Sequence, residues 1–563
     1  MTTTAADFKP SPKVVFEKNE DDVSTADANP AAACATPIDD VTTTATAASP
    51  TGLRAILANF CAETTAHGLP HLVKYRSWNL QRCAWLVIIC LATIGEFTHL
   101  ALLVRQYLEY PSSDSFRVSK QRPQFPAITV CNTHPVSELG WQAANSETFN
   151  SYLRWARSVN TVWDGSHAFY NRLNSAKGAF ENFNQSDTSL IGHQLEDLVM
   201  FCRYRGVDCD YEQDFTRFVS PTFFNCYTYN VPENIVDTGP DKGLTMVLFL
   251  EIKLTDFDRQ FDFTRDSHVE QTLGARVEIH EKGTLPNPLL NGINVQPGHH
   301  TDLVLKQSRR KKLGWPYSNC ESRSTLSEIS SYEYSTSGCL DVCKTMFVYE
   351  KCGCVNSDTP LPNSLRRRRQ SDDVSYCGTF HNTSDAGLDE LYAAVECERE
   401  ALLDFTSDDC VADNNNELFF CDEPCAYNTY DVSTSQSVWP SLVALYDTYD
   451  DYVRGTKATT LLGDAAGAPY NSSNHAQLRD LMWHNLARVN IYFNEPQIVE
   501  IKEVASMSLL QLFANVGGAI GLWAGLSVIT VLEFISLPCQ LVHYYGQQRR
   551  KAKNNVVKCN NLQ

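Results

Sequence analysis

The chain has 563 residues and a formal net charge of −19 at pH 7, with 66 acidic and 47 basic side chains. A surface of this charge repels phosphate backbones, so it argues against nucleic acid as a partner and is compatible with attracting cations. The possible fold classes are restricted less by the length of the chain than by its two apolar runs and the placement of its 20 cysteines.

The first 82 residues lead to a membrane. Residues 1–50 are rich in Thr, Ala, Asp and Pro and lack periodicity, so we expect a disordered cytoplasmic tail. Residues 51–82 hold a short amphipathic stretch and a polar pre-membrane segment that contains His67-Gly68.

The first apolar run, residues 83–105, has the length of a membrane-spanning helix. It starts too far along the chain for a cleavable signal peptide, so it is predicted to be an anchor. Glu96 and His99 interrupt it, and they face either the second span or water.

Residues 106–505 are predicted to form an extracellular domain. Basic residues precede the first span and follow the second, which places both termini in the cytoplasm. Fourteen cysteines lie in this segment, an even number typical of an oxidising compartment. Three candidate glycosylation sites also lie there, at Asn184, Asn382 and Asn471.

The extracellular segment is predicted to be mixed α+β. Strands are expected at Phe125–Asn132, Phe223–Asn230 and several later apolar stretches, because these are rich in β-branched and aromatic residues. Residues 140–215 are expected to be mostly helical, including "LEDLVMFCRYRG", where apolar residues recur at three- and four-residue spacing. Strands are expected to lead directly into and out of the membrane.

The second apolar run, residues 506–545, precedes a cytoplasmic tail at 546–563 and carries unusual residues for a span. Gly517, Gly521 and Gly525 recur every four residues, a pattern that also serves plain helix packing. Ser527 and Glu533 follow, and an intramembrane carboxylate is costly unless it faces protein or water. We therefore expect several copies to surround a pore, with residues 525–527 leaving the helix to present oxygen atoms to a cation.

Several motifs, which follow one another along the chain in the family's order, resemble those of the superfamily of epithelial sodium channels, degenerins and acid-sensing ion channels. They are His67-Gly68, "FPAITVCN", the Cys202–Cys209 loop before "CYTYN", "GWPYSNC" and Gly525-Leu526-Ser527. The resemblance covers about residues 60–545 and is closest to invertebrate FMRFamide-type peptide-gated sodium channels. It implies a trimer, homomeric or heteromeric, with a hand-shaped, disulfide-rich extracellular domain on two transmembrane helices in the plasma membrane.

The resemblance also implies roles for individual residues. Gly525, Leu526 and Ser527 match the selectivity filter, Ala514, Asn515, Gly518 and Glu533 the pore, and His67 and Gly68 a gating motif. The implied disulfides are Cys131–Cys226, Cys202–Cys209, Cys320–Cys425, Cys339–Cys421, Cys343–Cys410, Cys352–Cys397 and Cys354–Cys377.

The implied function is that of a sodium-selective, amiloride-sensitive, ligand-gated channel in the lipid bilayer, with no cofactor besides the permeant Na⁺. Acid-sensing members carry a histidine after the first span, where this chain reads Tyr110-Pro111-Ser112. By elimination we expect an extracellular neuropeptide to open the channel, and proton or mechanical gating remains the alternative.

Two other interpretations stay open. "LRRRRQ", at residues 365–370, is either a basic cleavage site or a solvated basic loop, with Arg366–Arg369 as its centre. A two-span receptor or ectoenzyme would share the topology, but the chain has no nucleophile elbow, zinc-protease motif or phosphate loop. We therefore predict that it is not an enzyme.

Overall fold

The computed structural model describes thirteen segments of the chain. They are residues 53–74, 79–144, 147–162, 166–183, 185–231, 237–252, 272–326, 329, 331–370, 374–381, 385–410, 421–462 and 472–560. The chain divides into two compact units, residues 1–91 with 524–563, and residues 92–523. The candidate glycosylation sites Asn184, Asn382 and Asn471 lie outside the described residues.

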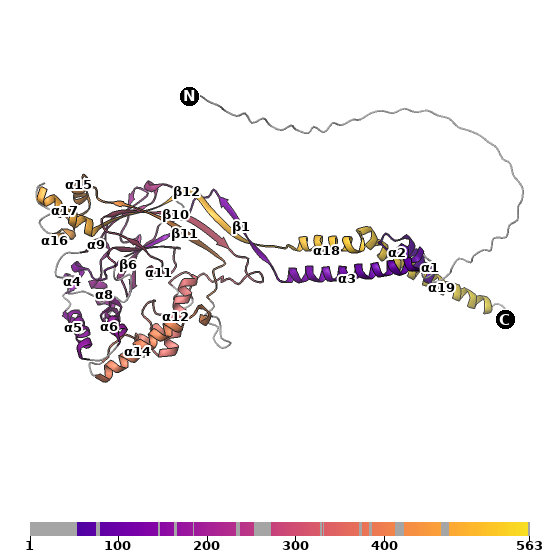
Figure 1. Ribbon diagram of the computed structural model, residues 1–563, viewed down its shortest axis with the longest axis horizontal. Helices are drawn as coiled ribbons and strands as arrows, with labels where there is room; N and C mark the ends of the chain where they lie inside the picture. Colours follow the sequence, from indigo (N-terminus) through magenta and orange to yellow (C-terminus); the bar gives the residue numbers. More distant parts are fainter. Residues whose placement is uncertain are drawn as a thin grey trace, which may run out of the picture. The chain divides into compact units, whose positions relative to one another are not determined.

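Two β-sheets form the centre of the larger unit (Figure 1). The first sheet contains β11 (Ala426–Val438), β10 (His299–Lys311), β12 (Leu486–Ala505), β7 (Leu244–Phe249), β3 (Val199–Tyr204) and β4 (Val207–Asp208), in that order. The second sheet contains β5 (Phe215–Ser220), β6 (Phe224–Tyr229), β2 (Ala127–Asn132), β8 (Ala275–His280) and β9 (Ile293–Val295). All neighbours pair antiparallel except β10 and β12, which are parallel.

The main hydrophobic core lies between these sheets. Ile128 and Val277 come from the second sheet, and Met246, Leu303 and Ile491 come from the first, and all five are fully buried. Inward side chains alternate along β10, whereas every residue of β2 and β6 is buried. Because both sheets bury apolar side chains in one core, they form a sandwich. The strands β2 and β6 lie where the sequence predicted strands, which agrees with the predicted α+β fold.

A further strand, β1 (Ser112–Ser119), lies immediately after the first apolar helix and pairs with the end of β12. The ladder runs antiparallel from Ser112 opposite Ala505 to Ser119 opposite Ile498. The backbone N–H of Ser506 extends it by donating to the carbonyl of Pro111 at 2.8 Å. The expectation that strands lead into and out of the apolar helices is therefore confirmed.

A group of helices precedes β3 and covers one end of the larger unit. It comprises α4 (Glu138–Ala144), α5 (Glu147–Val162), α6 (His167–Leu173), α7 (Ala176–Asn182), α8 (Gln185–Ile191) and α9 (Leu195–Leu198). The prediction of a helix through Gly206 was wrong, because only one turn forms before β3 begins. Pairing of β3 with β7 overrides the local helical spacing, and the Cys202–Cys209 disulfide closes the turn to β4.

The cysteine-rich segment forms a second helical group, with α12 (Thr336–Cys352), α13 (Asn363–Gln370) and α14 (Asp385–Asp404). Seven disulfides are present, and they join the same pairs that the resemblance implies. Cys352–Cys397 joins α12 directly to α14, and Cys343–Cys410 joins α12 to the segment that follows α14, so these two bridges fix the two helices against each other. The basic stretch at 365–370 is helical, so the interpretation as a loop was wrong.

The remaining short elements surround the sheets. They are η1 (Pro240–Lys242), α11 (Pro288–Asn291), η2 (Ser407–Cys410), α15 (Leu445–Tyr452), α16 (Ala458–Leu462) and α17 (Ser472–Asn485). Helices α15, α16 and α17 share a small core with the outer face of β7, where Val247 and Phe249 are buried.

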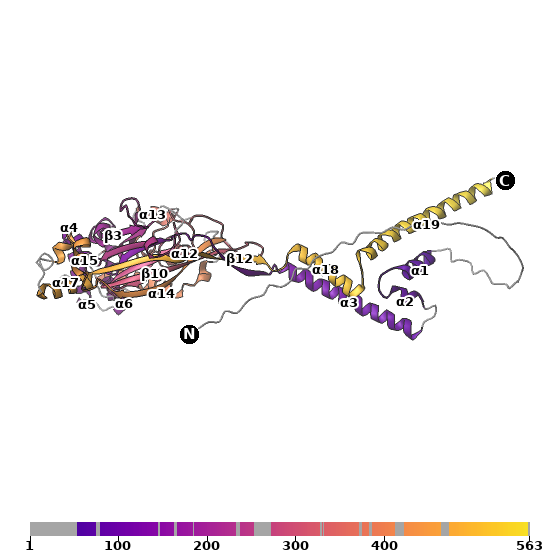
Figure 2. The same ribbon diagram turned by 90° about the horizontal axis from the view of Figure 1, so that it is seen from above.

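Among the residues that the structure describes, two helices are long and apolar enough to cross a membrane. They are α3 (Leu80–Leu108) and the Val528–Gln547 part of α19 (Val528–Asn560). Helix α18 (Leu509–Ala524) is apolar but shorter, and within the larger unit it lies beside α3 (Figure 2). The smaller unit also contains α1 (Leu53–Glu63) and α2 (Leu69–Lys74). Large apolar side chains of α3, such as Leu91, Ile94 and Phe97, are exposed, as expected for a surface that faces lipid or other copies.

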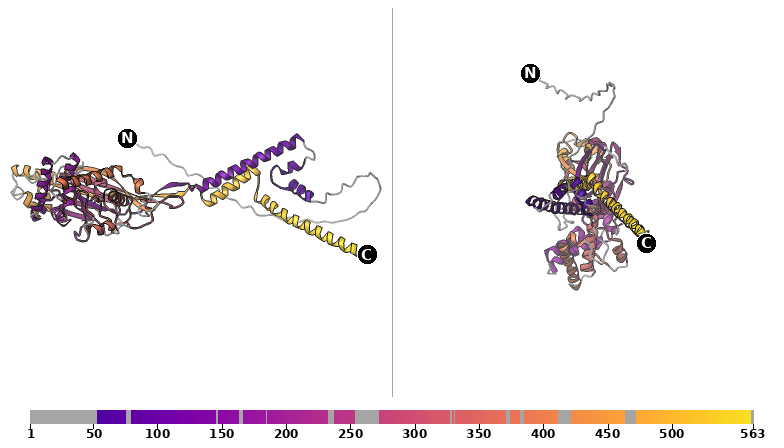
Figure 3. Two further views of the ribbon diagram at one scale, coloured as in Figure 1. Left: turned by 90° about the horizontal axis from the view of Figure 1, so that it is seen from below. Right: turned by 90° about the vertical axis from the view of Figure 1, so that its right-hand side faces the viewer.

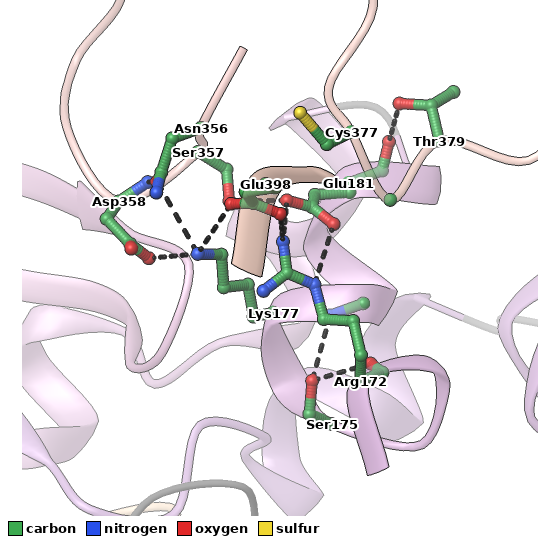
Figure 4. A network of polar contacts seen from close by, with 12 residues as sticks. Arg172, Ser175, Lys177, Glu181, Asn356, Ser357, Asp358, Cys377, Thr379 and Glu398 are labelled. Atoms are coloured by element: carbon green, nitrogen blue, oxygen red, sulfur yellow. Dashed lines mark hydrogen bonds and ion pairs between the residues drawn. The ribbon is translucent and has the colours of Figure 1, made fainter. Parts of the chain in front are cut away.

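Buried ion pairs connect the two helical groups of the larger unit (Figure 4). Arg172 of α6 contacts Glu181 of α7 at 2.7 Å and Glu398 of α14 at 3.0 Å. Lys177 of α7 contacts Asp358 at 2.6 Å and Glu398 at 3.5 Å. Glu398 of α14 therefore pairs with a cation from α6 and with one from α7.

Electrostatics within this network follow from its burial. Burial raises the pKa of Asp358, but the ammonium of Lys177 outweighs burial and lowers that pKa to about 2. Burial also raises the pKa of Glu181, and the nearby guanidinium of Arg172 opposes the rise. Asp358 favours the folded state above its unfolded pKa near 4, and this contribution is lost as pH falls from about 4 to about 2.

We predict that Arg172→Met destabilises the larger unit strongly. It leaves two buried carboxylates without their shared cation, a loss that costs about 3–5 kcal/mol. Lys351→Met is the matched control, because the Lys351–Asp404 pair joins α12 to α14 at the surface, where such pairs contribute about 0–1 kcal/mol. The melting temperature of the purified full-length protein should drop by several degrees more for Arg172→Met than for the control. Equal shifts would contradict a structural role for the network.

Candidate functional site

The second apolar run is not one continuous helix. Helix α18 ends at Ala524, residues 525–527 are not helical, and α19 begins at Val528 (Figure 3). Gly525 has a φ of +60°, a left-handed conformation that glycine adopts without the strain other residues incur. The chain therefore leaves the helix at the Gly-Leu-Ser motif where the sequence pattern predicted an interruption.

Ser527 restarts the helix as its N-cap. The Thr530 backbone N–H donates to Ser527 Oγ at 3.2 Å, and the Ser527 N–H donates to Thr530 Oγ1 at 3.1 Å. The Val531 N–H donates to the Ser527 carbonyl at 3.1 Å. This reciprocal pair satisfies backbone donors that a helix start leaves open, so α19 can begin within an apolar segment.

The His67-Gly68 motif lies directly against the interruption, within the smaller unit. A Cβ atom added to Gly525 would overlap His67 Nδ1, so the imidazole occupies the space that only glycine leaves free. Gly68 has a φ of +89°, and a Cβ atom there would lie 2.9 Å from Ile89 Cγ1. Glycine is thus required on both sides of this contact, and the pre-membrane turn and the Gly-Leu-Ser segment are close-packed.

Glu533 of α19 is hydrogen-bonded to the pre-membrane turn that precedes His67. Its Oε2 accepts hydrogen bonds from Thr64 Oγ1 and the Thr65 N–H, both at 2.9 Å, and from Thr65 Oγ1 at 3.2 Å. Thr65 Oγ1 also lies 2.6 Å from Thr530 Oγ1. Three donors from the pre-membrane turn therefore stabilise the carboxylate of Glu533 in α19, and the carboxylate in turn positions this turn.

Threonines at 64, 65 and 530 are the site residues that the sequence analysis missed. Their signal in the sequence was weak, because single hydroxyl residues are common in helices and in polar segments. The adjacent His67-Gly68 motif and the intramembrane Glu533 marked the two segments, but only the fold shows that hydroxyl groups connect them.

The remaining residues that the resemblance assigns to the pore lie on α18 in the larger unit. Ala514 and Gly518 are exposed and one helical turn apart, so they share a face that this chain leaves uncovered. Asn515 is half-buried, and Ala519 is buried. A face lined by small residues suits close contact with another copy of the helix.

His99 in α3 now has a structural explanation. Its Nδ1 accepts a hydrogen bond from Trp523 Nε1 of α18 at 3.3 Å. The same indole packs against Gly95, where an added Cβ atom would lie 2.6 Å from the Trp523 ring. His99 therefore faces the second apolar run, and Glu96 lies one turn before it on α3.

Contacts also tie α3 to the cysteine-rich part of the larger unit. Tyr110, at the end of α3, makes an edge-on ring contact with Tyr317, with 5.5 Å between ring centroids. Tyr317 belongs to the "GWPYSNC" motif. The Ser112 and Ser318 hydroxyls both donate to Glu503 of β12, at 2.6 and 2.7 Å. This junction connects the disulfide-braced helices to the strands that carry α3 and α18.

Aromatic residues of α5 and α6 belong mainly to the core. Phe169 and Tyr170 of α6 are buried in a cluster with residues of α5 and α14. Trp155 packs on Phe380, with 4.1 Å between ring centroids, and Trp163 lies outside the described residues. Phe169 and Tyr170 are therefore core residues of this helical group.

Comparison with known proteins agrees with the motifs. Residues 60–537 match the family model described as "Amiloride-sensitive sodium channel". An FMRFamide-activated amiloride-sensitive sodium channel of Cornu aspersum is 27% identical, covering 86% of this chain and 83% of the relative.

More distant relatives have other described roles. The alpha subunit of the epithelial sodium channel of Neoceratodus forsteri is 24% identical, covering 86% of this chain and 79% of the relative. Degenerin unc-8 of Caenorhabditis elegans is 26% identical, covering 76% of this chain and 51% of the relative. The matched family consists of ion channels, not enzymes, and its match covers most of the chain. The chain therefore belongs to the amiloride-sensitive sodium channel family of two-span membrane proteins.

Proposed function

We propose that this chain is a subunit of a trimeric, sodium-selective plasma-membrane channel that an extracellular neuropeptide opens and amiloride blocks. Both termini lie in the cytoplasm in this proposal. The observation that carries the pore assignment is the interruption at residues 525–527, held open by Gly525 and capped by Ser527. Peptide gating is supported by the FMRFamide-activated relative at 27% identity.

Trimer formation follows from the same segment. The described residues of one copy include two spans, and two helices cannot enclose water, so several copies must surround the axis. The uncovered small-residue face of α18 supplies a surface for that contact. Three interruptions then meet, and the carbonyl groups of Gly525 and Leu526 with the Ser527 hydroxyl provide oxygen ligands for a partly dehydrated Na⁺.

A stimulus reaches these helices through the larger unit. The β1–β12 ladder joins α3 and α18 through backbone hydrogen bonds, and Tyr110–Tyr317 links it to the disulfide-braced helices. A peptide that draws the two helical groups together or apart would move this ladder as a unit. His67 and Gly68 belong to the turn that packs against Gly525, and in this position they control the geometry of the filter.

One observation favours proton gating as a second candidate. Glu278 of β8 is buried, and burial raises the pKa of its carboxyl to about 7, although hydrogen bonds from Asn287 and Asn291 oppose the rise. Because the pKa is raised, the group is protonated below about pH 7 and charged above it. An acid step within the physiological range would therefore change the charge of this strand.

The first test is two-electrode voltage clamp on cells that express this chain alone. An amidated FMRFamide-type peptide should evoke an inward current that amiloride blocks, and an acid step from pH 7.5 to 6 should evoke none. A flat response across a broad amidated-peptide library would contradict peptide gating. A current on acidification that Glu278→Gln abolishes would establish the proton-gated alternative instead.

The pore assignment predicts that Gly525→Ala abolishes most of the current. The new methyl group collides with His67, and alanine at a φ of +60° adds strain of about 1–3 kcal/mol. Peptide-evoked current should fall roughly tenfold or more at equal surface expression, since about 1.4 kcal/mol is a factor of ten. Gly546→Ala in α19, where an added Cβ atom meets nothing within 4 Å, is the matched control and should conduct normally. Equal currents from both variants would remove residues 525–527 from the conduction path.

A further inference from the structure

A cavity of about 590 Å³ lies in the larger unit, between the helical group before β3 and the cysteine-rich segment. Its lining includes Arg217 of β5, Arg366 and Arg369 of α13, and the aromatic rings of Phe180, Phe218 and Tyr376. A volume of this size matches sites for small organic ligands, which are mostly apolar with a few placed polar groups. The cavity is distinct from the Gly-Leu-Ser interruption, which belongs to the smaller unit.

The charge of this cavity is opposite to that of the protein. Three guanidinium groups line it, and the described lining residues include no carboxylate, although the chain carries a net charge of −19. Burial raises the pKa of Tyr376, and the charges of Arg369 and Arg366 oppose that rise, so both cations act on the same ring. Like charges at one site repel each other unless an anion lies among them.

Arg369 supplies the most direct indication of an absent partner. Its guanidinium carbon lies over the Tyr376 ring, 3.6 Å from the ring centroid. Its Nη1 atom is buried and has no hydrogen-bond acceptor within the part of the chain that the structure describes. A buried charged donor without an acceptor is costly, so an oxygen atom from a ligand would be favoured there.

Arg217 and Arg366 are exposed, whereas Arg369 is half-buried, so an anion can enter from solvent and reach all three. Guanidinium groups bind planar oxyanions through paired hydrogen bonds. The rings of Phe180, Phe218 and Tyr376 offer apolar contacts to whatever carries the anion. The lining therefore suits an amphipathic anion and disfavours a cation.

We propose that this basic-aromatic cavity binds a carboxylate attached to an aromatic or aliphatic group, as a modulatory site separate from the pore. The carboxylate comes from a free small molecule or from the unblocked C-terminus of a peptide. An amidated, positively charged peptide lacks that carboxylate and is repelled by the three arginines. The cavity is therefore not the site of the neuropeptide agonist in the proposed function.

The test is equilibrium binding to the purified full-length protein, measured by calorimetry. The probes are N-acetyl-phenylalanine and a tetrapeptide with a free C-terminal phenylalanine, each compared with its C-terminal amide. Both acids, or one of them, should bind, and neither amide should bind. The acid that binds identifies the source of the carboxylate. Equal binding of acids and amides, or no binding of either acid, would overturn the proposal.

Variants locate the binding to this cavity. Arg369→Gln and Arg217→Gln should each weaken acid binding roughly tenfold or more, as expected for loss of a charged hydrogen bond. Arg367→Gln is the matched control, because Arg367 is an exposed arginine of the same helix whose Nε faces the Asn363 carbonyl. It should change affinity by less than about twofold.

Two further outcomes would contradict the proposal. Because Arg369 also packs on Tyr376, Arg369→Gln could weaken binding through a folding defect. Arg217→Gln lies on a different element and tests the cavity without that contact. Unchanged affinity in both variants would overturn the assignment. Asp372 and Asp373 follow α13 in the sequence and lie outside the described residues. Binding that appears only in the double variant Asp372→Asn/Asp373→Asn would also overturn the proposal, because a carboxylate of the chain itself would then be the anion that the cavity binds.

Discussion

A helix in a membrane can be interrupted only where its freed backbone groups find other partners. At residues 525–527 the chain meets this requirement with its own side chains: Ser527 and Thr530 cap the restarted helix, and Gly525 accepts the left-handed turn. The pre-membrane turn then packs on the interruption, with Glu533 bonded to Thr64 and Thr65. Each of these contacts depends on the break in the helix. The break also exposes oxygen atoms, and this explains why an apolar span contains glycine, serine and glutamate.

Covalent bridges, buried ion pairs and a β-ladder connect the elements of the larger unit. Disulfides fix α12 and α14, buried ion pairs around Arg172 join α14 to α6 and α7, and the β1–β12 ladder holds the strand ends that continue into α3 and α18. Ion pairs with two cations and three carboxylates are specific in geometry but sensitive to the loss of one member. In the proposed function, a ligand that displaces either helical group would therefore displace its connected neighbours as well.

Much of this architecture could be predicted from the sequence because its signals are local. The two apolar runs, the strand pair around them and the interruption at Gly525 all follow from residue type and spacing. The disulfide pairs needed the family resemblance, since counting cysteines leaves many pairings. The helix predicted through Gly206 failed because pairing of β3 with β7 outweighs local periodicity. Thr64, Thr65 and the Arg369 cavity depend on contacts between distant segments, which no local pattern encodes.

The central claim is that residues 525–527 form the narrowest part of a sodium path. Its most direct test is the reversal potential of the peptide-evoked current when extracellular Na⁺ is replaced by K⁺, in the natural chain and in Ser527→Ala. The account predicts a large negative shift for the natural chain and a clearly smaller one for Ser527→Ala, because the variant loses both a hydroxyl ligand and the cap of α19. An equal shift in the two proteins would contradict it.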